Sequence, residues 1–363
     1  MQQLQVNLDQ RSYSIIIESN SLAACGKAIS TYCPAKKYII ISDSTVAALY
    51  AESVINSLKQ IKAECHLYQI APGETSKSMI CAEQIYTWLL ANRFHRDDVI
   101  VALGGGVVGD LAGFIAATFL RGVRWVQIPT TLMAQVDSSV GGKVGVNHPL
   151  AKNSIGAFYQ PQLVWIDPLT LKTLPQREIY NGLAEVIKYG LILDAALFVY
   201  LEANLKALLA LESETVIAHV IETCCRLKSR VVEQDEREGN FRRVLNFGHT
   251  VGHALEQITD YSYFRHGEAV AWGMLAAAAI SEKKAGLPPE EHRRLVLMIE
   301  QLQKPAVPMG ITAEQIMQAM QSDKKMTASG LQFVLLERIG KTRIAPVELQ
   351  LIEEGIQQLL GTN

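Results

Sequence analysis

Residues 98–110 have the sequence DVIVALGGGVVGD, in which an apolar run leads directly into glycines. The run from Asp98 to Leu103 predicts a strand buried on both faces, because its apolar side chains are continuous rather than alternating. A helix is predicted from Val108 to Phe119. The glycines satisfy the spacing G-x-G-x-x-G, which lets the backbone approach a phosphate and places N–H donors at a helix N-terminus. The stretch therefore predicts an α/β domain that binds a dinucleotide.

The glycine turn departs from the usual dinucleotide fingerprint. It follows a later strand than the first, and no acidic residue lies about twenty positions after it. Asp43 instead closes an earlier predicted strand, where a ribose or an adenine could be bound. Glycines also serve tight strand–helix turns that hold no ligand, so the spacing alone leaves both interpretations open.

Around this stretch, predicted strands and helices alternate over roughly the first 175 residues, which is typical of a parallel sheet covered by helices on both faces. The expected strands are 38–43, 65–70, 98–103 and 125–129, and the expected helices are 45–61, 78–92 and 108–119. From residue 178 the pattern becomes helical. We expect helices at 178–192, 195–209, 213–233, 244–259, 267–285, 289–303 and 312–321, a hairpin at 332–343 and a final helix. The sequence therefore predicts two domains, residues 1–175 and residues 176–363.

The composition indicates a well-packed globular protein, since 49% of the 363 residues are hydrophobic and 19% are charged. A net charge of -2 gives no reason to expect a nucleic acid or a membrane as partner. Neither a signal peptide nor an apolar run of about 20 residues is visible. The six cysteines show no C-x-x-C spacing, so we expect reduced thiols and a cytoplasmic location.

A polar stretch at residues 129–147, PTTLMAQVDSSVGGKVGVN, contains a Gly-Gly-Lys sequence that invites comparison with a P-loop. The comparison fails, because Asp137 stands where the P-loop has a glycine and Val144 follows the lysine where Ser or Thr should bind Mg²⁺. Lys152 and Asn153 add a second pair of side chains suited to an anion. An ordinary polar loop is the alternative to a ligand-binding loop here.

The candidates for metal binding lie in the helical half. His249 and His253 are one helical turn apart on one face, His266 follows, and Glu185 lies in an earlier helix. Neutral imidazoles and a carboxylate make a zinc-type shell with positions open for a substrate. Taken singly, each histidine is more often structural. Arg242, close before the histidines, is a candidate for neutralising a carboxylate or a phosphate.

Four stretches together resemble the 3-dehydroquinate synthase family: residues 104–110, 129–147, 184–190 and 246–256. The resemblance runs from about Ser42 to Lys325. It implies a dehydroquinate synthase-like fold, in which a Rossmann-like, parallel-sheet domain that binds NAD precedes a helical domain that binds a divalent metal, Zn²⁺ or Co²⁺. It also implies a homodimer, in which Arg121 reaches the substrate phosphate of the partner subunit.

The resemblance also implies a role for each matching residue. The metal ligands become Glu185, His249 and His266, and His253 becomes a substrate contact or a proton-handling residue instead of a ligand. The other substrate-contacting or catalytic positions are Asp137, Lys143, Asn153, Lys188, Lys228, Glu238, Arg242, Asn246 and one of Lys324 or Lys325. The cofactor shell comprises Asp43, Glu74, Lys77, Gly105, Gly106, Val107, Asp110, Thr130, Thr131, Ser138, Lys143, Lys152, Thr173 and Leu174. Ala151, Thr45 and Leu49 depart from the family pattern, which affects the expected fine contacts of the cofactor.

The family reaction converts 3-deoxy-D-arabino-heptulosonate 7-phosphate to 3-dehydroquinate and phosphate, a step of the shikimate pathway to aromatic amino acids. It implies transient oxidation by NAD⁺, β-elimination of phosphate, re-reduction, ring opening and aldol closure. Three alternatives stay open: a cyclase for another sugar phosphate, a metal-dependent polyol dehydrogenase and a non-catalytic dinucleotide sensor. The cationic residues argue against an uncharged polyol, and a complete metal triad argues against a sensor.

Overall fold

The computed structural model describes residues 1–323 and 331–361, and its chain forms two compact units. The first unit comprises Met1–Leu174 and Leu211–Arg237, and the second comprises Pro175–Ala210 and Glu238–Asn363. The chain passes from the first unit to the second after Leu174, returns to the first at Leu211 and enters the second again at Glu238.

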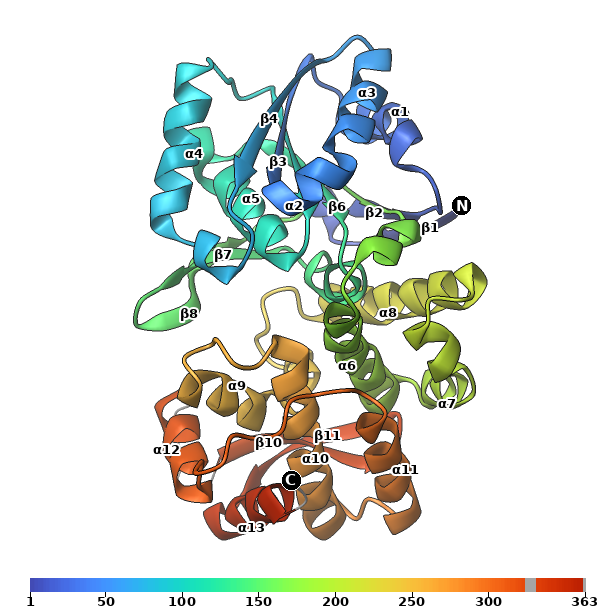
Figure 1. The fold of residues 1–363 in the computed structure, drawn as a ribbon, viewed down its shortest axis with the longest axis vertical. Helices are drawn as coiled ribbons and strands as arrows, with labels where there is room; N and C mark the ends of the chain where they lie inside the picture. Colours follow the sequence, from blue (N-terminus) through green and yellow to red (C-terminus); the bar gives the residue numbers. More distant parts are fainter. Residues whose placement is uncertain (324–330, 362–363) are drawn as a thin grey trace. The chain divides into compact units, whose positions relative to one another are not determined.

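A seven-stranded sheet forms the centre of the first unit (Figure 1). Its strand order is β1-β2-β9-β6-β5-β3-β4, and every neighbouring pair is parallel except β1 and β2. The parallel sheet confirms the predicted fold class. The strands are β1 (Gln2–Val6), β2 (Tyr13–Ile17), β3 (Lys37–Asp43), β4 (Glu64–Ile70), β5 (Val99–Gly104), β6 (Arg124–Pro129) and β9 (Leu163–Ile166).

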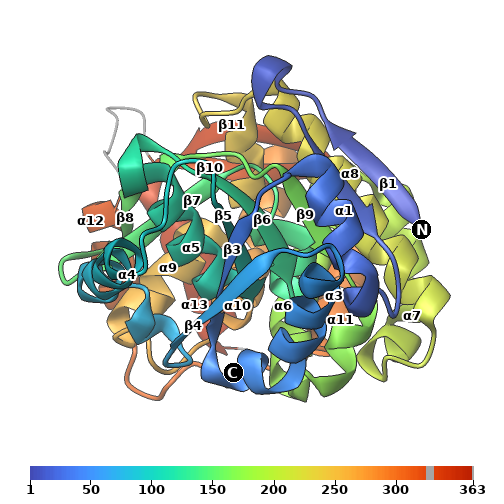
Figure 2. The ribbon, with the colours of Figure 1, turned by 90° about the horizontal axis from the view of Figure 1, so that it is seen from above.

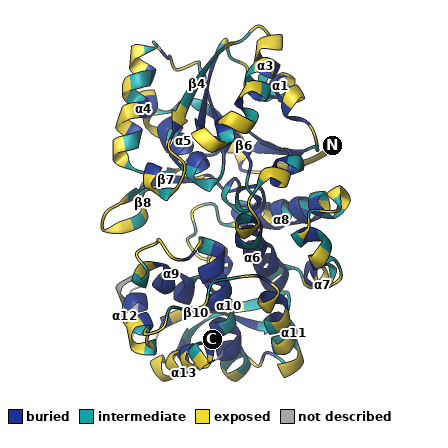
Figure 3. Ribbon diagram, in the orientation of Figure 1, coloured by how far each residue is buried: buried dark blue, intermediate teal, exposed yellow. Residues whose placement is uncertain are grey.

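Helices cover both faces of this sheet, which explains its continuous apolar strands. Ile39 and Ile41 of β3 pack in one core with α4 (Met79–Ala91) and α5 (Gly106–Thr118). The alternate residues Tyr38 and Ile40 pack in another core with α1 (Cys25–Tyr32) and α3 (Glu52–Gln60). Figure 2 shows these two helix pairs on opposite sides of the strands. Figure 3 shows the central strands of the sheet buried and the outer surfaces of the helices exposed, whereas the edge strands β1 and β4 are partly exposed.

The polar stretch at 129–147 is more ordered than a loop. It contains a π-helical turn, η6 (Ala134–Ser138), and then the strand β7 (Lys143–His148), which forms an antiparallel hairpin with β8 (Ala151–Phe158). The helix α8 (Glu214–Gln234) also belongs to this unit, and the thiol of Cys225 donates a hydrogen bond to the Gln135 carbonyl of η6 at 3.1 Å. The sequence patterns did not predict β1, β2, β9 or this hairpin.

The second unit is mainly helical, as predicted. Its core packs α9, α10, α12 and α13 with the two-stranded hairpin. The elements are α6 (Gln176–Leu193), α7 (Ala195–Leu209), the 3-10 helix η8 (Phe241–Asn246), α9 (His249–Ile258), α10 (His266–Ala285), α11 (Pro289–Glu300), α12 (Ala313–Asp323), β10 (Leu331–Arg338), β11 (Lys341–Val347) and α13 (Leu349–Gly361).

One predicted helix is wrong in its extent. The sequence predicts a single helix over 244–259, but η8 ends at Asn246 and α9 begins at His249. Gly248 separates them with φ +79°, a left-handed conformation that glycine adopts without steric cost. Within the described residues, no helix has the length and apolarity that crossing a membrane requires.

Candidate functional site

Glu185 is a deeply buried carboxylate in the middle of α6. Its side chain is 1% exposed, and Lys188, one helical turn later, forms an ion pair with its Oε2 atom. In the described chain neither Glu185 oxygen accepts a hydrogen bond of ordinary geometry. Burying a carboxylate is costly unless its lone pairs are satisfied. The position therefore suits a second positively charged partner beside Lys188.

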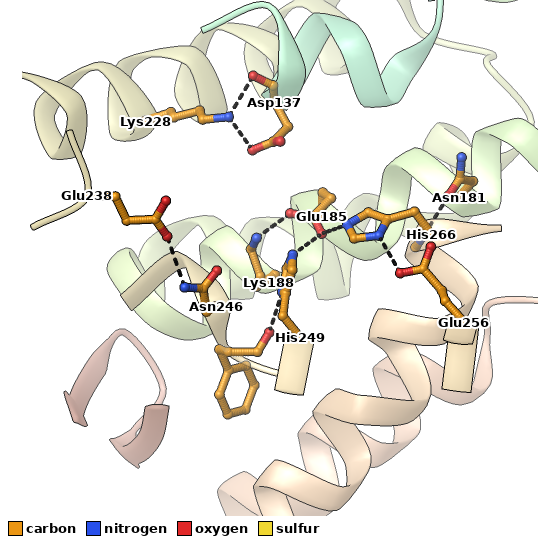
Figure 4. Close-up of polar contacts among 12 residues, drawn as sticks. Asp137, Asn181, Glu185, Lys188, Lys228, Glu238, Asn246, His249, Glu256 and His266 are labelled. Atoms are coloured by element: carbon orange, nitrogen blue, oxygen red, sulfur yellow. Dashed lines mark hydrogen bonds and ion pairs between the residues drawn. The ribbon is translucent and has the colours of Figure 1, made fainter. Parts of the chain in front are cut away.

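Two imidazoles of the second unit face this carboxylate (Figure 4). The Nε2 atoms of His249 and His266 lie 3.7 and 3.8 Å from Glu185 Oε1. One ligand atom from each of these three residues lies within 4.8 Å of the other two. Three donors converging without direct hydrogen bonds between them leave room for an ion at their centre. The structure thus brings together the three residues that the resemblance names as ligands.

Each of the two rings is oriented through its other nitrogen. The Nδ1 atom of His249 lies 3.2 Å from the backbone oxygen of Phe247, and the Nδ1 atom of His266 lies 3.2 Å from Glu256 Oε2. Both contacts turn Nε2 toward Glu185. Burial, with the positive charge of Lys188, also holds the pKa of His249 well below its ordinary value of 6.5. This imidazole is therefore neutral at physiological pH, as a metal ligand must be.

His253 lies beside these two histidines, on the next turn of α9. Its ring centroid is 5.3 Å from that of His249 and 5.9 Å from that of His266. Its ligand atoms group with Glu256 and His266 rather than with Glu185. Glu256 already contacts His266 Nδ1. The group of Glu185, His249 and His266 is therefore better arranged to bind an ion than the group of His253, Glu256 and His266.

The second unit contains further polar residues that the sequence predicts for the site. Lys188 is 2% exposed and Arg242 of η8 is 1% exposed, so two predicted cations are buried rather than solvated. Asn246 donates a hydrogen bond from Nδ2 to Glu238 Oε1 at 3.1 Å. The predicted contacts Lys324 and Lys325 lie outside the described residues.

The glycine turn of the first unit is packed closely against the polar stretch that follows β6. Gly105 is the N-cap residue of α5, and a methyl group there would lie 2.9 Å from Thr131 Cγ2. A methyl group on Gly106 would lie 3.1 Å from Ser138 Oγ. The hydroxyl of the buried Thr130 has no hydrogen-bond partner in the described part of the chain. A narrow glycine turn with an unsatisfied hydroxyl beside a helix N-terminus suits an anionic ligand.

Asp43 and the glycine turn end adjacent strands. The order β5-β3-β4 means that the chain reverses its direction across the sheet between β3 and β5, and ligands of such sheets bind at this switch point. Asp43 Oδ1 accepts hydrogen bonds from the backbone N–H groups of Thr45 and Val46, both at 3.0 Å. Val107 follows in the first turn of α5. Asp43 and the glycine turn thus both lie at the carboxyl ends of adjacent parallel strands.

A polar cluster occupies the same unit near the β7–β8 hairpin. Lys77 is 4% exposed, and its Nζ atom contacts Asp110 Oδ2 at 2.5 Å and also Asn153 Oδ1. Asn147 donates from Nδ2 to Glu74 Oε1 at 2.8 Å. No sequence pattern points to Asn147, because Glu74, its hydrogen-bond partner, is 73 positions away along the chain.

The remaining predicted residues of this unit are spread over several elements. Lys228 of α8 contacts Asp137 at both Oδ1 and the backbone oxygen, each at 2.8 Å, as Figure 4 shows. The hydroxyls of Thr173 and Tyr50 lie 2.5 Å apart. Lys143 begins β7, Lys152 lies in β8, Leu174 follows a 3-10 helix, and Arg121 ends another with φ +64°.

Comparison with known proteins identifies close relatives. The family model described as 3-dehydroquinate synthase N-terminal matches residues 67–181, and the one described as 3-dehydroquinate synthase C-terminal matches residues 182–326. A protein of Desulforamulus reducens named 3-dehydroquinate synthase is 48% identical over 342 residues, which cover 94% of this chain and 95% of the relative.

Two solved structures share the fold. A 2-deoxy-scyllo-inosose synthase complexed with carbaglucose-6-phosphate, NAD⁺ and Co²⁺ has a TM-score of 0.89 at 27% identity, covering 98% of this chain and 100% of that one. A 2-epi-5-epi-valiolone synthase from Streptomyces hygroscopicus, with NAD⁺ and Zn²⁺ bound, has the same score and identity, covering 98% and 99%.

Proposed function

The chain belongs to the 3-dehydroquinate synthase family, and from this premise we propose that it converts 3-deoxy-D-arabino-heptulosonate 7-phosphate to 3-dehydroquinate and phosphate. The observation that carries the proposal is the convergence of Glu185, His249 and His266 in a chain that is 48% identical to a relative of that name. The reaction is a step in the synthesis of aromatic amino acids. It makes the chain a carbon–oxygen lyase that acts on a phosphate ester.

We propose that Glu185, His249 and His266 hold a divalent ion, Zn²⁺ or Co²⁺. The donor set fits, because the carboxylate is buried without hydrogen bonds of ordinary geometry and both Nε2 atoms face it. Two structural relatives with these ions support the choice of metal. Such an ion, when bound, would supply acidification of a coordinated hydroxyl, as Zn²⁺ lowers the pKa of bound water to about 7.

NAD is the proposed cofactor of the first unit. Bound there, NAD⁺ would supply a hydride acceptor that is regenerated within each turnover, so the reaction would have no net oxidation. The glycine turn with the unsatisfied Thr130 hydroxyl fits its pyrophosphate, and Asp43 lies at the neighbouring strand end. The proposed cofactor contacts are Asp43, Glu74, Lys77, Gly105, Gly106, Val107, Asp110, Thr130, Thr131, Ser138, Lys143, Lys152, Thr173 and Leu174.

The substrate carries a phosphate and a carboxylate, which suit the buried cations. Lys188 and Arg242 are almost fully buried, and Lys228 is held by Asp137, so their charges are fixed in place before any substrate arrives. The remaining proposed contacts are Lys143, Asn153, Glu238, Asn246, His253 and one of Lys324 or Lys325. We also propose a cytoplasmic homodimer, in which Arg121 reaches the phosphate bound by the partner subunit.

A cyclase for another sugar phosphate is the competing function, since one solved relative is complexed with carbaglucose-6-phosphate. The 27% identity of the two solved relatives is well below the 48% of the named 3-dehydroquinate synthase, which favours the proposed substrate. A polyol dehydrogenase would have no use for buried cations beside its site.

Incubating the protein with the heptulosonate phosphate, NAD⁺ and Zn²⁺ tests the proposal directly. We expect release of inorganic phosphate without accumulation of NADH, because the hydride is returned in each turnover. NADH accumulating in step with turnover would instead indicate a dehydrogenase. Turnover of sedoheptulose 7-phosphate, with none of the heptulosonate phosphate, would indicate another cyclase.

A further inference from the structure

Asn147 lies near the end of β7, where the hairpin loses its regular register. The register of β7 and β8 shifts between Val146 and His148, so the ladder is interrupted at Asn147. The Asn147 backbone instead donates to the Lys77 carbonyl at 2.8 Å, and Asn147 forms an isolated parallel bridge with Ser78. Such irregularities redirect a side chain away from the sheet it would otherwise join.

The redirected side chain uses its amide in two directions at once. Its Nδ2 donates to Glu74 Oε1 at 2.8 Å, and its Oδ1 accepts from the backbone N–H of Asn153 at 2.9 Å. The carboxamide of Asn or Gln provides a donor and an acceptor on one short planar group. An aspartate here would keep the acceptor but would place a second carboxylate against Glu74.

Asn153, whose N–H makes this contact, has an unusual backbone conformation. Its φ is +56°, in the left-handed region that Asn tolerates better than most residues. Its side-chain Oδ1 in turn accepts from Lys77, which also contacts Asp110. Asn147 contacts the side chain of Glu74, the carbonyl of Lys77 and the N–H of Asn153, so it lies at the centre of the cluster.

We propose that Asn147 is a positioning residue that couples dinucleotide binding to substrate binding. The inference rests on the proposed function, in which Glu74 and Lys77 contact the cofactor and Asn153 contacts the substrate. The Asn147 amide contacts Glu74 of the cofactor set and Asn153 of the substrate set. Lys77 of the cofactor set also contacts Asn153 directly. Ordering Glu74 and Lys77 by the cofactor therefore also orders Asn153 for the substrate, and by thermodynamic linkage the substrate orders the cofactor residues to the same degree.

The test measures NAD⁺ affinity with and without a substrate analogue in which a methylene group replaces the phosphate ester oxygen. In the wild type we expect the analogue to tighten NAD⁺ binding. In Asn147→Asp and Asn147→Ala we expect NAD⁺ alone to bind about tenfold more weakly, as for a lost hydrogen bond to a charged group. The tightening by the analogue should also shrink in both variants, because only the direct contact between Lys77 and Asn153 then links the two sets.

His148→Ala is the matched control, because the His148 side chain is exposed and contacts the nearby backbone of Leu150 within the same hairpin. It should leave both affinities and their coupling unchanged. Glu74→Gln added to Asn147→Asp recreates an amide–carboxylate bond with its polarity reversed. This pair should recover part of the coupling, which a purely structural defect of the hairpin would not allow.

Three outcomes would overturn the inference: a wild type with no coupling, variants that keep it in full, or a His148→Ala control that loses it equally. Thermal unfolding of each variant shows whether the fold is intact. Phosphate release by the wild type tests the proposed function separately. The NAD⁺ titrations need no turnover, so they decide the role of Asn147 even in a chain that does not release phosphate.

Discussion

The carboxylate oxygen Oε2 of Glu256 lies 3.2 Å from His266 Nδ1, and both residues belong to the second unit. Glu256 is on α9 and 2% exposed, whereas His266 begins α10. A buried carboxylate that accepts a hydrogen bond from Nδ1–H leaves Nε2 as the basic nitrogen of the ring. The contact therefore selects the form of His266 that can bind an ion beside Glu185.

Replacing Glu256 by alanine should weaken zinc binding by about 10–100-fold, the usual effect of losing a carboxylate that orients a metal-bound histidine. Competition with a chromophoric chelator measures the affinity without relying on activity. Glu256→Gln keeps a hydrogen-bond acceptor for Nδ1 and should lose less. Equal zinc affinity in Glu256→Ala and the wild type would remove Glu256 from this role.

A methyl group added to α10 at Gly273 should disturb the metal site through the backbone that precedes His249. A Cβ on Gly273 would lie 1.9 Å from the backbone oxygen of Gly248, the residue before His249. Backbone cannot yield as a side-chain end does, so we expect Gly273→Ala to lower the free energy of unfolding by about 3 kcal/mol or more. Zinc content should fall as well, because His249 is displaced.

Gly361→Ala is the control for this substitution, since a Cβ there meets no atom of residues 1–323 or 331–361 within 4 Å and alanine favours a helix. Urea unfolding curves of the two variants, with zinc measured in the folded fraction, decide the matter. A Gly273→Ala protein as stable as the wild type would show that α9 and α10 are packed differently.

The buried thiols should be unreactive and should make stability fall at high pH. Burial raises the pKa of Cys25 and of Cys225 to about 12, from an ordinary value of 9.0. A raised pKa means that the folded state favours the protonated thiol. The resulting contribution to the free energy of unfolding is complete below pH 9 and is lost as pH rises toward 12. At pH 8, iodoacetamide should modify Cys225 only after unfolding in urea, as mass spectrometry can show. Equal rates in native and unfolded protein would contradict the burial.

The sequence predicted those strands of the sheet that have a continuous run of apolar residues. The strand and glycine turn at 98–110 appear as β5 and the start of α5, because buried parallel strands and helix N-termini leave strong local signals. The four-residue strand β9 gave no comparable signal, since its place between β2 and β6 comes from pairing with distant residues. Gly248 indicates a break in the predicted helix over 244–259, because glycine within a helical pattern disfavours its continuation.

The metal triad illustrates the same limit for a site. The H-x-x-x-H spacing predicts that His249 and His253 share a helix face, but it cannot tell which of them faces Glu185 on another helix. The family resemblance made that choice, and the structure has His249 Nε2 at 3.7 Å from Glu185. Asn147 carried no signal at all, because its hydrogen bonds exist only once the hairpin has folded back.

Substitution of Lys228 by methionine should mainly impair capture of the substrate. Methionine keeps the length and the packing of the side chain but removes the charge held by Asp137 through two contacts of 2.8 Å. The change leaves a partly buried carboxylate without this cation, so we expect kcat/KM to fall at least about 100-fold, in line with the loss of a buried charge contact. Lys172→Met is the control, because Lys172 is an exposed lysine of the same unit that pairs with Glu214. Steady-state phosphate release from both variants makes the comparison, and a Lys228→Met enzyme with unchanged kcat/KM would exclude this lysine from the site.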